Sequence, residues 1–184
     1  MKEIAPADRL SILRDIYSDV LQWLHFAEAK NAALATLNSA AIIGVATVYS
    51  QLNSTPLWLC WAMAVVSGFF LSSLLLGILS FMPRLSLLPW SGTPTAGKPG
   101  NVWFFGHIAA MGVDGFLKEL SRKSDTKIGA SELESDLAQQ IVVNSKIAVK
   151  KYAIFKLALW ITLSGVITPV GTLILYWLFI DEAV

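Results

Sequence analysis

The hydrophobic residues of this chain are concentrated in two long uncharged segments. The first covers 53 consecutive residues, 31–83, without Lys, Arg, Asp, Glu or His, and the second covers residues 157–180. A bilayer has about 30 Å of hydrocarbon, which a helix of about 20 residues crosses. The first segment is therefore long enough for two spans, and its polar residues 51–56 form a turn between them. We expect membrane spans at residues 31–52, 57–82 and 153–180.

Each span is predicted to be an α-helix, because the backbone groups of an open strand would have no hydrogen-bond partners in lipid. The composition agrees with a membrane protein, since 55% of the residues are hydrophobic and the mean hydropathy is +0.60. The first uncharged segment begins only after thirty mostly amphipathic residues, so we expect no signal peptide.

The basic residues predict the orientation of the chain. Of the 14 Lys and Arg residues, four precede the first span and nine lie between the second span and the third, whereas residues 51–56 and 181–184 have none. Basic loops stay on the cytoplasmic side of a membrane. We therefore expect a cytoplasmic N-terminus, a cytoplasmic segment at residues 83–152, and an external tail at residues 181–184.

Two long helices are predicted to continue from the cytoplasm into the membrane. Apolar residues recur at intervals of three or four between Pro6 and Lys30, which is typical of an amphipathic helix, and neither Gly nor Pro separates this cytoplasmic segment, residues 1–30, from the first span. A single helix of about 45 residues follows. The sequence from Ser131 to Glu134 fits a capping box and predicts the start of the second long helix, which continues into the third span.

The inner face of this second helix is predicted to be partly polar, and Asn144 in it is a candidate for fixing the register of a helix bundle or an oligomer. The full set of expected inner residues is Leu133, Leu137, Gln140 or Ile141, Asn144, Ala148 and Tyr152. A further short helix is expected at residues 114–123, after a turn at 111–113. The predicted fold is an all-α membrane protein with three transmembrane helices, the first and third continuous with long cytoplasmic helices that form a small, mostly helical cytoplasmic module.

Small residues follow one another at intervals of four along each span. The three series, which we call the small-residue ladders, are Ala32, Thr36, Ala40 and Gly44; Cys60, Ala64, Gly68 and Ser72; and Ser164, Thr168 and Thr172. Such ladders let helices approach closely, either within one protomer or between protomers, and the sequence does not choose between the two. Asn31 and Asn38 are polar groups in the first span; interhelical hydrogen bonds are their commoner use, and a pore-lining role is the alternative.

The sequence offers little catalytic chemistry. Residues 92–98 have the spacing of a phosphate-binding loop, but Pro99 follows Lys98 where such loops carry Ser or Thr, so we favour a connector over a nucleotide-hydrolysing enzyme. His25 and His107 are the only histidines and Cys60 is the only cysteine, which gives no metal-ligand spacing. We expect no enzyme activity, no metal, no cofactor and no nucleic-acid binding. A constitutive membrane scaffold that holds a cytoplasmic partner through the helix at residues 6–30 stays an alternative.

Three stretches carry a specific resemblance. They are Phe26-Ala27-Glu28-Ala29-Lys30-Asn31-Ala32-Ala33-Leu34 with Asn38 beyond it; Asn101-Val102-Trp103-Phe104-Phe105-Gly106-His107-Ile108-Ala109; and Leu137 to Ile141 followed by Asn144 to Ala148 and by Lys150-Lys151-Tyr152. Together, in this order around the spans, they resemble the Pycsar effector transmembrane family. The resemblance implies an anti-phage effector of the bacterial inner membrane. A partner pyrimidine nucleotide cyclase makes cyclic CMP or cyclic UMP during infection, and the effector, an expected homo-oligomer, impairs membrane integrity, so that the infected cell stops growing or dies.

A site for such a nucleotide needs a cation for the phosphate and an aromatic face for the base. The predicted ligand-binding residues are Asn101, Phe104, Phe105, His107, Lys150 and Lys151. Against this stands a structural interpretation, in which the two phenylalanines pack under a turn and the two lysines mark the membrane interface. The predicted gating or packing residues are Glu28, Lys30, Asn31, Asn38 and Asn144.

Overall fold

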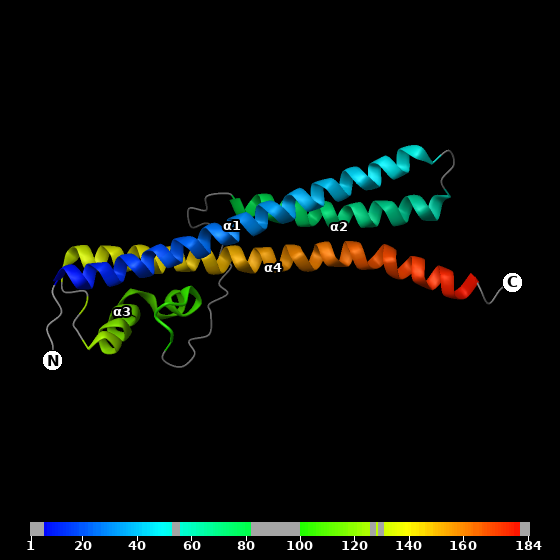
Figure 1. Cartoon of the computed structure of the whole chain (residues 1–184). Coiled ribbons are helices and arrows are strands. Elements are labelled where there is room, and N and C mark those ends of the chain that lie inside the picture. Colours follow the sequence, from blue (N-terminus) through cyan, green and yellow to red (C-terminus); the bar gives the residue numbers. More distant parts are fainter. Residues whose placement is uncertain (1–5, 53–55, 82–99, 126–127, 129–130, 181–184) are drawn as a thin grey trace. The chain divides into compact units, whose positions relative to one another are not determined.

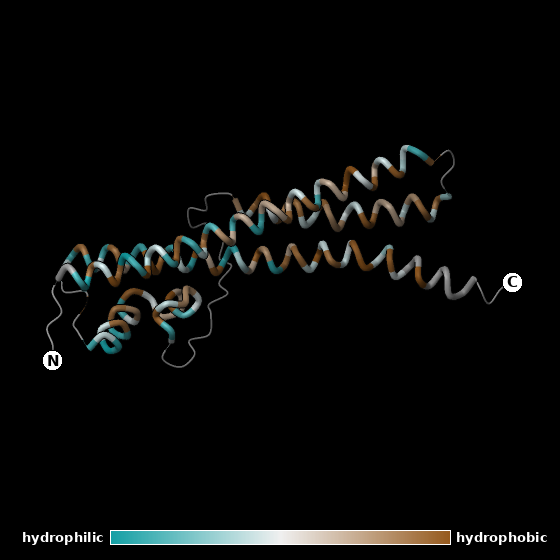
Figure 2. The backbone as a smooth tube through the Cα atoms, in the orientation of Figure 1, coloured by the Kyte–Doolittle hydropathy of each residue, from teal (hydrophilic) through white to brown (hydrophobic). Residues whose placement is uncertain are grey.

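The computed structural model describes residues 6–52, 56–81, 100–125, 128 and 131–180. These residues form four helices, α1 (Pro6–Gln51), α2 (Leu57–Phe81), α3 (Phe105–Ser124) and α4 (Glu132–Ile180) (Figure 1). Three of them, α1, α2 and α4, are long and apolar enough to cross a membrane. Figure 2 shows the hydropathy of each described residue along these helices. The predicted all-α membrane fold is therefore confirmed. The connector at residues 83–98, with the phosphate-loop-like sequence, and the tail at 181–184 lie outside the described residues.

The two long helices are continuous, as the sequence predicted. α1 has 46 residues and α4 has 49, so each joins an amphipathic part to an apolar part without interruption. α4 begins directly after Ser131, whose Oγ accepts a hydrogen bond from the Glu134 backbone N–H at 3.2 Å. This bond satisfies one of the free N–H groups of the first turn, which is how a capping serine starts a helix.

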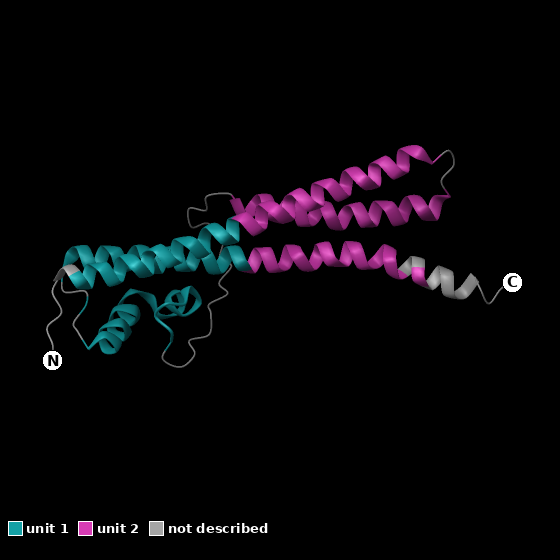
Figure 3. Ribbon diagram, viewed as in Figure 1, with its two compact units in different colours: residues 1–28, 84–152 teal, residues 29–83, 153–184 magenta. Residues whose placement is uncertain are grey.

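The chain divides into two compact units (Figure 3). Unit 1 comprises residues 1–28 and 84–152, and unit 2 comprises residues 29–83 and 153–184. α1 passes from unit 1 into unit 2 after Glu28, and α4 does so after Tyr152. Unit 2 contains the apolar lengths of the three spanning helices, and unit 1 contains the amphipathic lengths together with α3.

Unit 1 has a hydrophobic core to which α1, α3 and α4 all contribute. Its fully buried members are Leu13, Ile16 and Val20 of α1, Ile108 and Phe116 of α3, and Ala138, Ile141 and Ala148 of α4. Along α1 and α4 these positions are three, four or seven residues apart, so each of these two helices turns one apolar face inward. Burial of this face accounts for the amphipathic pattern at residues 6–30.

The predicted inner face of α4 was wrong at its start. Leu133 is 59% exposed, whereas the neighbouring Glu134 is 1% exposed. The Glu134 carboxylate lies 3.1 Å from Arg9 Nε of α1, and a buried carboxylate requires such a partner. The start of α4 therefore turns its acid, and not its leucine, toward α1. About two turns before the end of unit 1 at Tyr152, Ser145 is buried and the predicted register residue Asn144 is half-buried.

α3 contains a break at Gly112, which has φ 71° and ψ −178°. A residue with a side chain rarely adopts this backbone conformation, so glycine suits the position. The break coincides with the turn predicted at residues 111–113, and the helix that follows was also predicted. The helical turns from Phe105 to Met111 were not predicted.

Unit 2 is held together by polar side chains in the middle of its helices. Asn38 Nδ2 donates to Ser73 Oγ at 2.9 Å, Thr162 Oγ1 donates to Asn38 Oδ1 at 3.0 Å, and the two hydroxyl oxygens are 2.8 Å apart. We call these three residues the polar node. It joins α1, α2 and α4, and each of its members is at most 3% exposed. Asn31 Nδ2 makes a second interhelical bond, to Ser80 Oγ at 3.2 Å.

Close packing in unit 2 is confined to part of each helix. The buried residues that the structure describes there fall within residues 31–38 of α1, 70–80 of α2 and 158–165 of α4. Farther along α1 and α2, side chains from Ile42 to Tyr49 and from Cys60 to Ser67 line a groove of about 310 Å³. The small-residue ladders point away from these contacts, since all their described members are exposed except Cys60, which is half-buried. In a single chain the ladders therefore do not mediate the packing of the three spans.

Replacement of Gly165 by leucine is expected to destabilise unit 2. A Cβ atom at Gly165 would lie 3.0 Å from the Phe69 Cβ, and an atom so close to the backbone of α2 cannot move away cheaply. Overpacking of this kind typically costs about 1–3 kcal/mol. Thermal unfolding in detergent should show a lower midpoint for Gly165→Leu. Gly171→Leu is the matched control, because a Cβ there meets no atom within 4 Å. Equal midpoints for the two variants would contradict the packing described.

Candidate functional site

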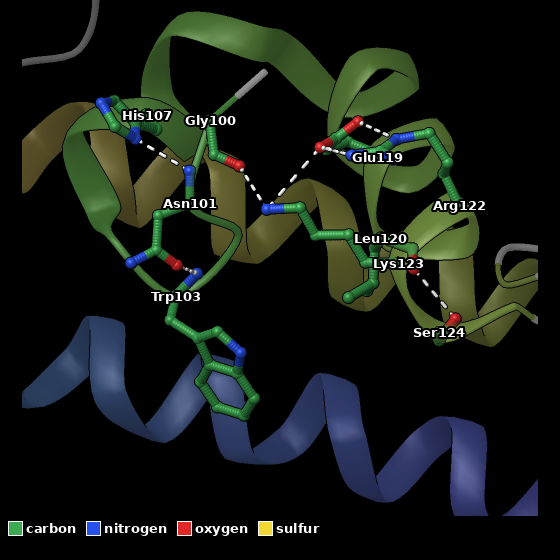
Figure 4. Close-up of polar contacts among 9 residues, drawn as sticks. All are labelled: Gly100, Asn101, Trp103, His107, Glu119, Leu120, Arg122, Lys123 and Ser124. Carbon is green, nitrogen blue, oxygen red and sulfur yellow. Dashed lines mark hydrogen bonds and ion pairs between the residues drawn. The ribbon is translucent and has the colours of Figure 1, made fainter. Parts of the chain in front are cut away.

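The segment that leads into α3 is a turn built by two of the predicted site residues (Figure 4). Asn101 Oδ1 accepts a hydrogen bond from the Trp103 N–H at 2.9 Å, and the Asn101 N–H donates to His107 Nδ1 at 2.9 Å. Nδ1 can accept this bond only when it carries no proton. Asn101 and His107 therefore position the turn, and their bonding to it limits what they can offer a ligand.

α3 fixes the same turn from its other end. Lys123 Nζ donates to the Gly100 carbonyl at 2.9 Å and lies 3.6 Å from Glu119, which also pairs with Arg122 at 2.7 Å (Figure 4). The hydrogen bond from Arg122 lowers the pKa of Glu119. A side chain at Gly100 would meet His107 at 2.8 Å, so the close approach requires glycine. Sequence reasoning missed Gly100, Glu119 and Lys123 as parts of the site. The Glu119–Arg122 spacing was visible in the sequence, but the contact between Lys123 and Gly100 was not.

Six rings form an aromatic cluster in unit 1, five from α1, α3 and α4 and one from Phe104 directly before α3. Phe105 is its centre, with ring centroids 4.8 Å from Phe104, 5.7 Å from Trp23 and 5.3 Å from Tyr152, on which it stacks. Phe26 and His107 are the outer members, at 6.4 Å from Trp23 and 5.3 Å from Phe104. Phe105 is buried, whereas Trp23, Phe26, Phe104 and His107 are exposed. The second and third sequence stretches thus meet at Phe105 and Tyr152.

An ion pair joins α1 and α4 beside this cluster. Lys151 Nζ donates to Glu28 Oε1 at 2.5 Å, and His25 Nδ1 lies 3.5 Å from the other carboxylate oxygen. The Lys151 hydrogen bond is the largest cause of a lowered pKa at Glu28, while burial raises the pKa of Tyr152. Both partners are the last or next-to-last residues of their helices in unit 1. The pair therefore fastens the two helices at the level where both enter unit 2.

The structure brings together only some of the predicted site residues. Asn101, Phe104, Phe105 and His107 share the turn, and Lys151 is linked to them through its neighbour Tyr152. Lys150 is exposed on α4. In unit 2, Lys30 Nζ lies 5.7 Å from the Phe155 ring centroid, while Asn31 and Asn38 form the hydrogen bonds described above.

Unit 1 exposes aromatic rings and the ammonium group of Lys150. Aromatic faces and ammonium groups suit a base and a phosphate. Within the described residues no three His, Cys, Asp or Glu side chains come together as ligands for a metal ion.

Residues 12–179 of the chain match the Pycsar effector protein domain family. Because the match covers most of the sequence, the chain belongs to this family. Its membership indicates a Pycsar anti-phage effector with a transmembrane domain, and the family is not a known catalytic one. Two further comparisons, with curated proteins and with solved structures, found no match.

The ion pair between Glu28 and Lys151 predicts a pH dependence of stability. The pKa of Glu28 in the folded protein lies below its ordinary value of 4.5, so the ion pair stabilises the fold above that pH and is lost as the pH falls through the lowered value. Because the glutamate is partly exposed, its contribution is about 1 kcal/mol or less.

Thermal unfolding from pH 7 to pH 3 should show Glu28→Gln melting below the unaltered protein at neutral pH, with the difference vanishing in acid. Asp15→Asn, at an exposed position of α1, is the control. A difference between Glu28→Gln and the unaltered protein that persists undiminished at pH 3 would exclude the ion pair as its cause.

Proposed function

We propose that this protein responds to a cyclic pyrimidine mononucleotide, cyclic CMP or cyclic UMP, and then impairs the integrity of the bacterial inner membrane. In this proposal a pyrimidine nucleotide cyclase supplies the ligand during phage infection, and unit 1 faces the cytoplasm with the N-terminus, as the basic residues favour. The effector acts as a homo-oligomer whose rearrangement opens a pore or disorders the bilayer. The infected cell then stops growing, and the phage with it.

The observation that carries the proposal is the aromatic cluster, with Lys151 next to its member Tyr152 in the chain and Lys150 exposed on the same turn of α4. A cyclic mononucleotide presents one negative phosphate and one flat base, which match an ammonium group and an aromatic face. Phe104 is the exposed ring of the turn, and it is our candidate for stacking on the base. Phe105 lies beneath it in the core, while Asn101 and His107 hold the turn in place.

In this proposal Lys150 and Lys151 both bind the phosphate of the nucleotide, but their roles differ. Lys150 is exposed, whereas Lys151 already pairs with Glu28. A phosphate that approaches Lys151 competes with the Glu28 carboxylate for the same ammonium group. Displacement of Glu28 would release α1 from α4 directly before both helices enter unit 2, which gives a ligand a route to the spans through continuous helices.

The packing of unit 2 supports the proposed rearrangement of the spans. Its three helices share the polar node and a short buried length, and the rest of each helix has few contacts within the chain. A rearrangement therefore breaks few interactions. The small-residue ladders, whose described members are exposed except for the half-buried Cys60, suit close packing against other copies of the chain, which supports assembly into an oligomer.

The scaffold alternative assigns the helix at residues 6–30 to a cytoplasmic partner. The apolar face of this helix is not available for that contact. That face, with Leu13, Ile16 and Val20, lies in the core of unit 1 and is fully buried by the protein's own α3 and α4.

The direct test measures dye release from liposomes that contain the purified protein, on addition of cyclic CMP or cyclic UMP. Lys150→Ala is the informative variant, because Lys151→Ala would also break the ion pair with Glu28. Loss of one charged contact, worth about 1.5–3 kcal/mol, should raise the nucleotide concentration for half-maximal release by about tenfold or more.

Lys146→Ala is the matched control, since Lys146 is an exposed lysine one turn earlier on α4. Calorimetry with the same nucleotides reports binding separately from release. Release that is identical in Lys150→Ala and Lys146→Ala would remove Lys150 from the site. Absence of both binding and release with either nucleotide would contradict the proposed function.

A further inference from the structure

Among the described residues, only those of α1 and α2 line the groove in unit 2. Ala46 of α1 and Ala64 and Ser67 of α2 are three of them, and the groove has a volume of about 310 Å³. The chain's own α4 does not enter it, since no described side chain of α4 after Gly165 is buried. Because the groove lies between two membrane-spanning helices, what fills it comes from within the bilayer and is either a lipid chain or another helix.

One hydroxyl group in this groove makes no hydrogen bond within the described part of the chain. It is that of Ser67, which is half-buried. Every other Ser or Thr side chain that the structure describes in unit 2 takes part in a hydrogen bond. A hydroxyl without a partner is costly in hydrocarbon. A lipid chain cannot supply that partner, whereas a polar side chain of another helix can, so the Ser67 hydroxyl favours a helix.

The contacts within unit 2 show which part of α4 lies level with Ser67. In the polar node, Ser73 of α2 meets Thr162 of α4. Gly165, three residues after Thr162, approaches α2 on the side of the node that leads to Ser67. Ser67 lies six residues from Ser73, and Thr168 lies six residues from Thr162, which is about 9 Å along each helix. Ser67 and Thr168 are therefore at one level of the spans.

Thr168 offers the chemistry that Ser67 needs. It is exposed on α4, and its Oγ1 donates to the Ser164 carbonyl at 2.7 Å. A hydroxyl oxygen accepts hydrogen bonds while it donates one, so Thr168 Oγ1 can accept from Ser67. Copies of the chain with the same orientation in a membrane have both residues at the same depth. The small side chains of Ala46 and Ala64 in the groove let a helix approach closely.

We propose that the groove between α1 and α2 binds α4 of a second copy of this chain, and that Ser67 Oγ donates a hydrogen bond to Thr168 Oγ1 of that copy. This inference rests on the homo-oligomer of the proposed function and assigns its contact surface. The contact is present in the membrane without nucleotide. Each copy offers both a groove and an α4, so the contact runs head to tail, and its repetition generates a closed ring.

Disulfide cross-linking in membranes without nucleotide tests this contact. Two differently tagged forms of the full-length protein, both with Cys60→Ser, are co-expressed, one with Ser67→Cys and the other with Thr168→Cys. Each form has one cysteine, so a product with both tags joins two copies. Oxidation with copper phenanthroline should give several-fold more of this product than the pair of Ser67→Cys with Val166→Cys. Val166 is the matched control, because it is exposed on α4 about 200° around the helix from Thr168.

Three results would overturn the proposal. Equal cross-linking of residues 166 and 168 to residue 67 would mean that α4 has no defined face toward the groove. Products that mostly carry one tag would mean that like helices meet. No cross-linking at either position would leave the groove to lipid.

Energy transfer between copies labelled outside the spans, in liposomes without nucleotide, tests the hydrogen bond itself. Ser67→Ala should weaken association about threefold, the mean effect of one interhelical hydrogen bond in a membrane. Ser72→Ala is the control, since the exposed Ser72 already donates to the Gly68 carbonyl of its own helix. Equal association of the two variants would contradict the assigned bond. Nucleotide binding and dye release test the proposed function separately, so the two failures are distinguishable.

Discussion

The structure depends on the inability of hydrocarbon to satisfy polar groups. Backbone amides in the spans must bond within their own helix, which makes α1, α2 and α4 helical whatever their side-chain propensities. The same constraint acts on side chains. Asn38, Ser73 and Thr162 satisfy one another in the polar node, because an amide left alone in lipid would be costly. Hydrophobic burial contributes little between helices in lipid, so these hydrogen bonds and the close approach at Gly165 hold unit 2 together.

A different solvent governs unit 1, although α1 and α4 build both units. Outside the apolar lengths, water drives burial of Leu13, Ile16 and Ile141 into an ordinary hydrophobic core. Burial of apolar residues from water therefore stabilises one part of α1 and of α4, and polar contacts between spans stabilise the other part. The two parts meet close to Glu28 in α1 and Lys151 in α4. The two charges of this ion pair are partly exposed, Lys151 by 15% and Glu28 by 37% of their side-chain surface, so water still solvates both.

The sequence was sufficient to predict the helices and insufficient to predict their contacts. Charge-free lengths, the serine cap at residue 131 and the glycine at residue 112 are local signals, and the helices begin, continue and break where these signals are. The prediction for the inner face of α4 was wrong at its first turn, because the first turns carry apolar residues on more than one side. The burial of Glu134 could not be predicted, since its partner Arg9 is distant in sequence. In the candidate site, the grouping of Asn101 with His107 followed from the sequence, since six residues separate them. Their use in building the turn, the stacking of Phe105 on Tyr152 and the pairing of Lys151 with Glu28 required the fold.

The topology that we propose has three helices that cross the bilayer, with Ser124 on its cytoplasmic side and Gln51 on its external side. Single cysteines at Gln51 and at Ser124, each with Cys60→Ser, test it in intact cells with a membrane-impermeant maleimide. Both positions border the described helices, at the end of α1 and the end of α3. We predict that the residue 51 cysteine reacts from outside and that the residue 124 cysteine reacts only after the membrane is permeabilised. Reaction of both cysteines from the same side would contradict the three-span arrangement.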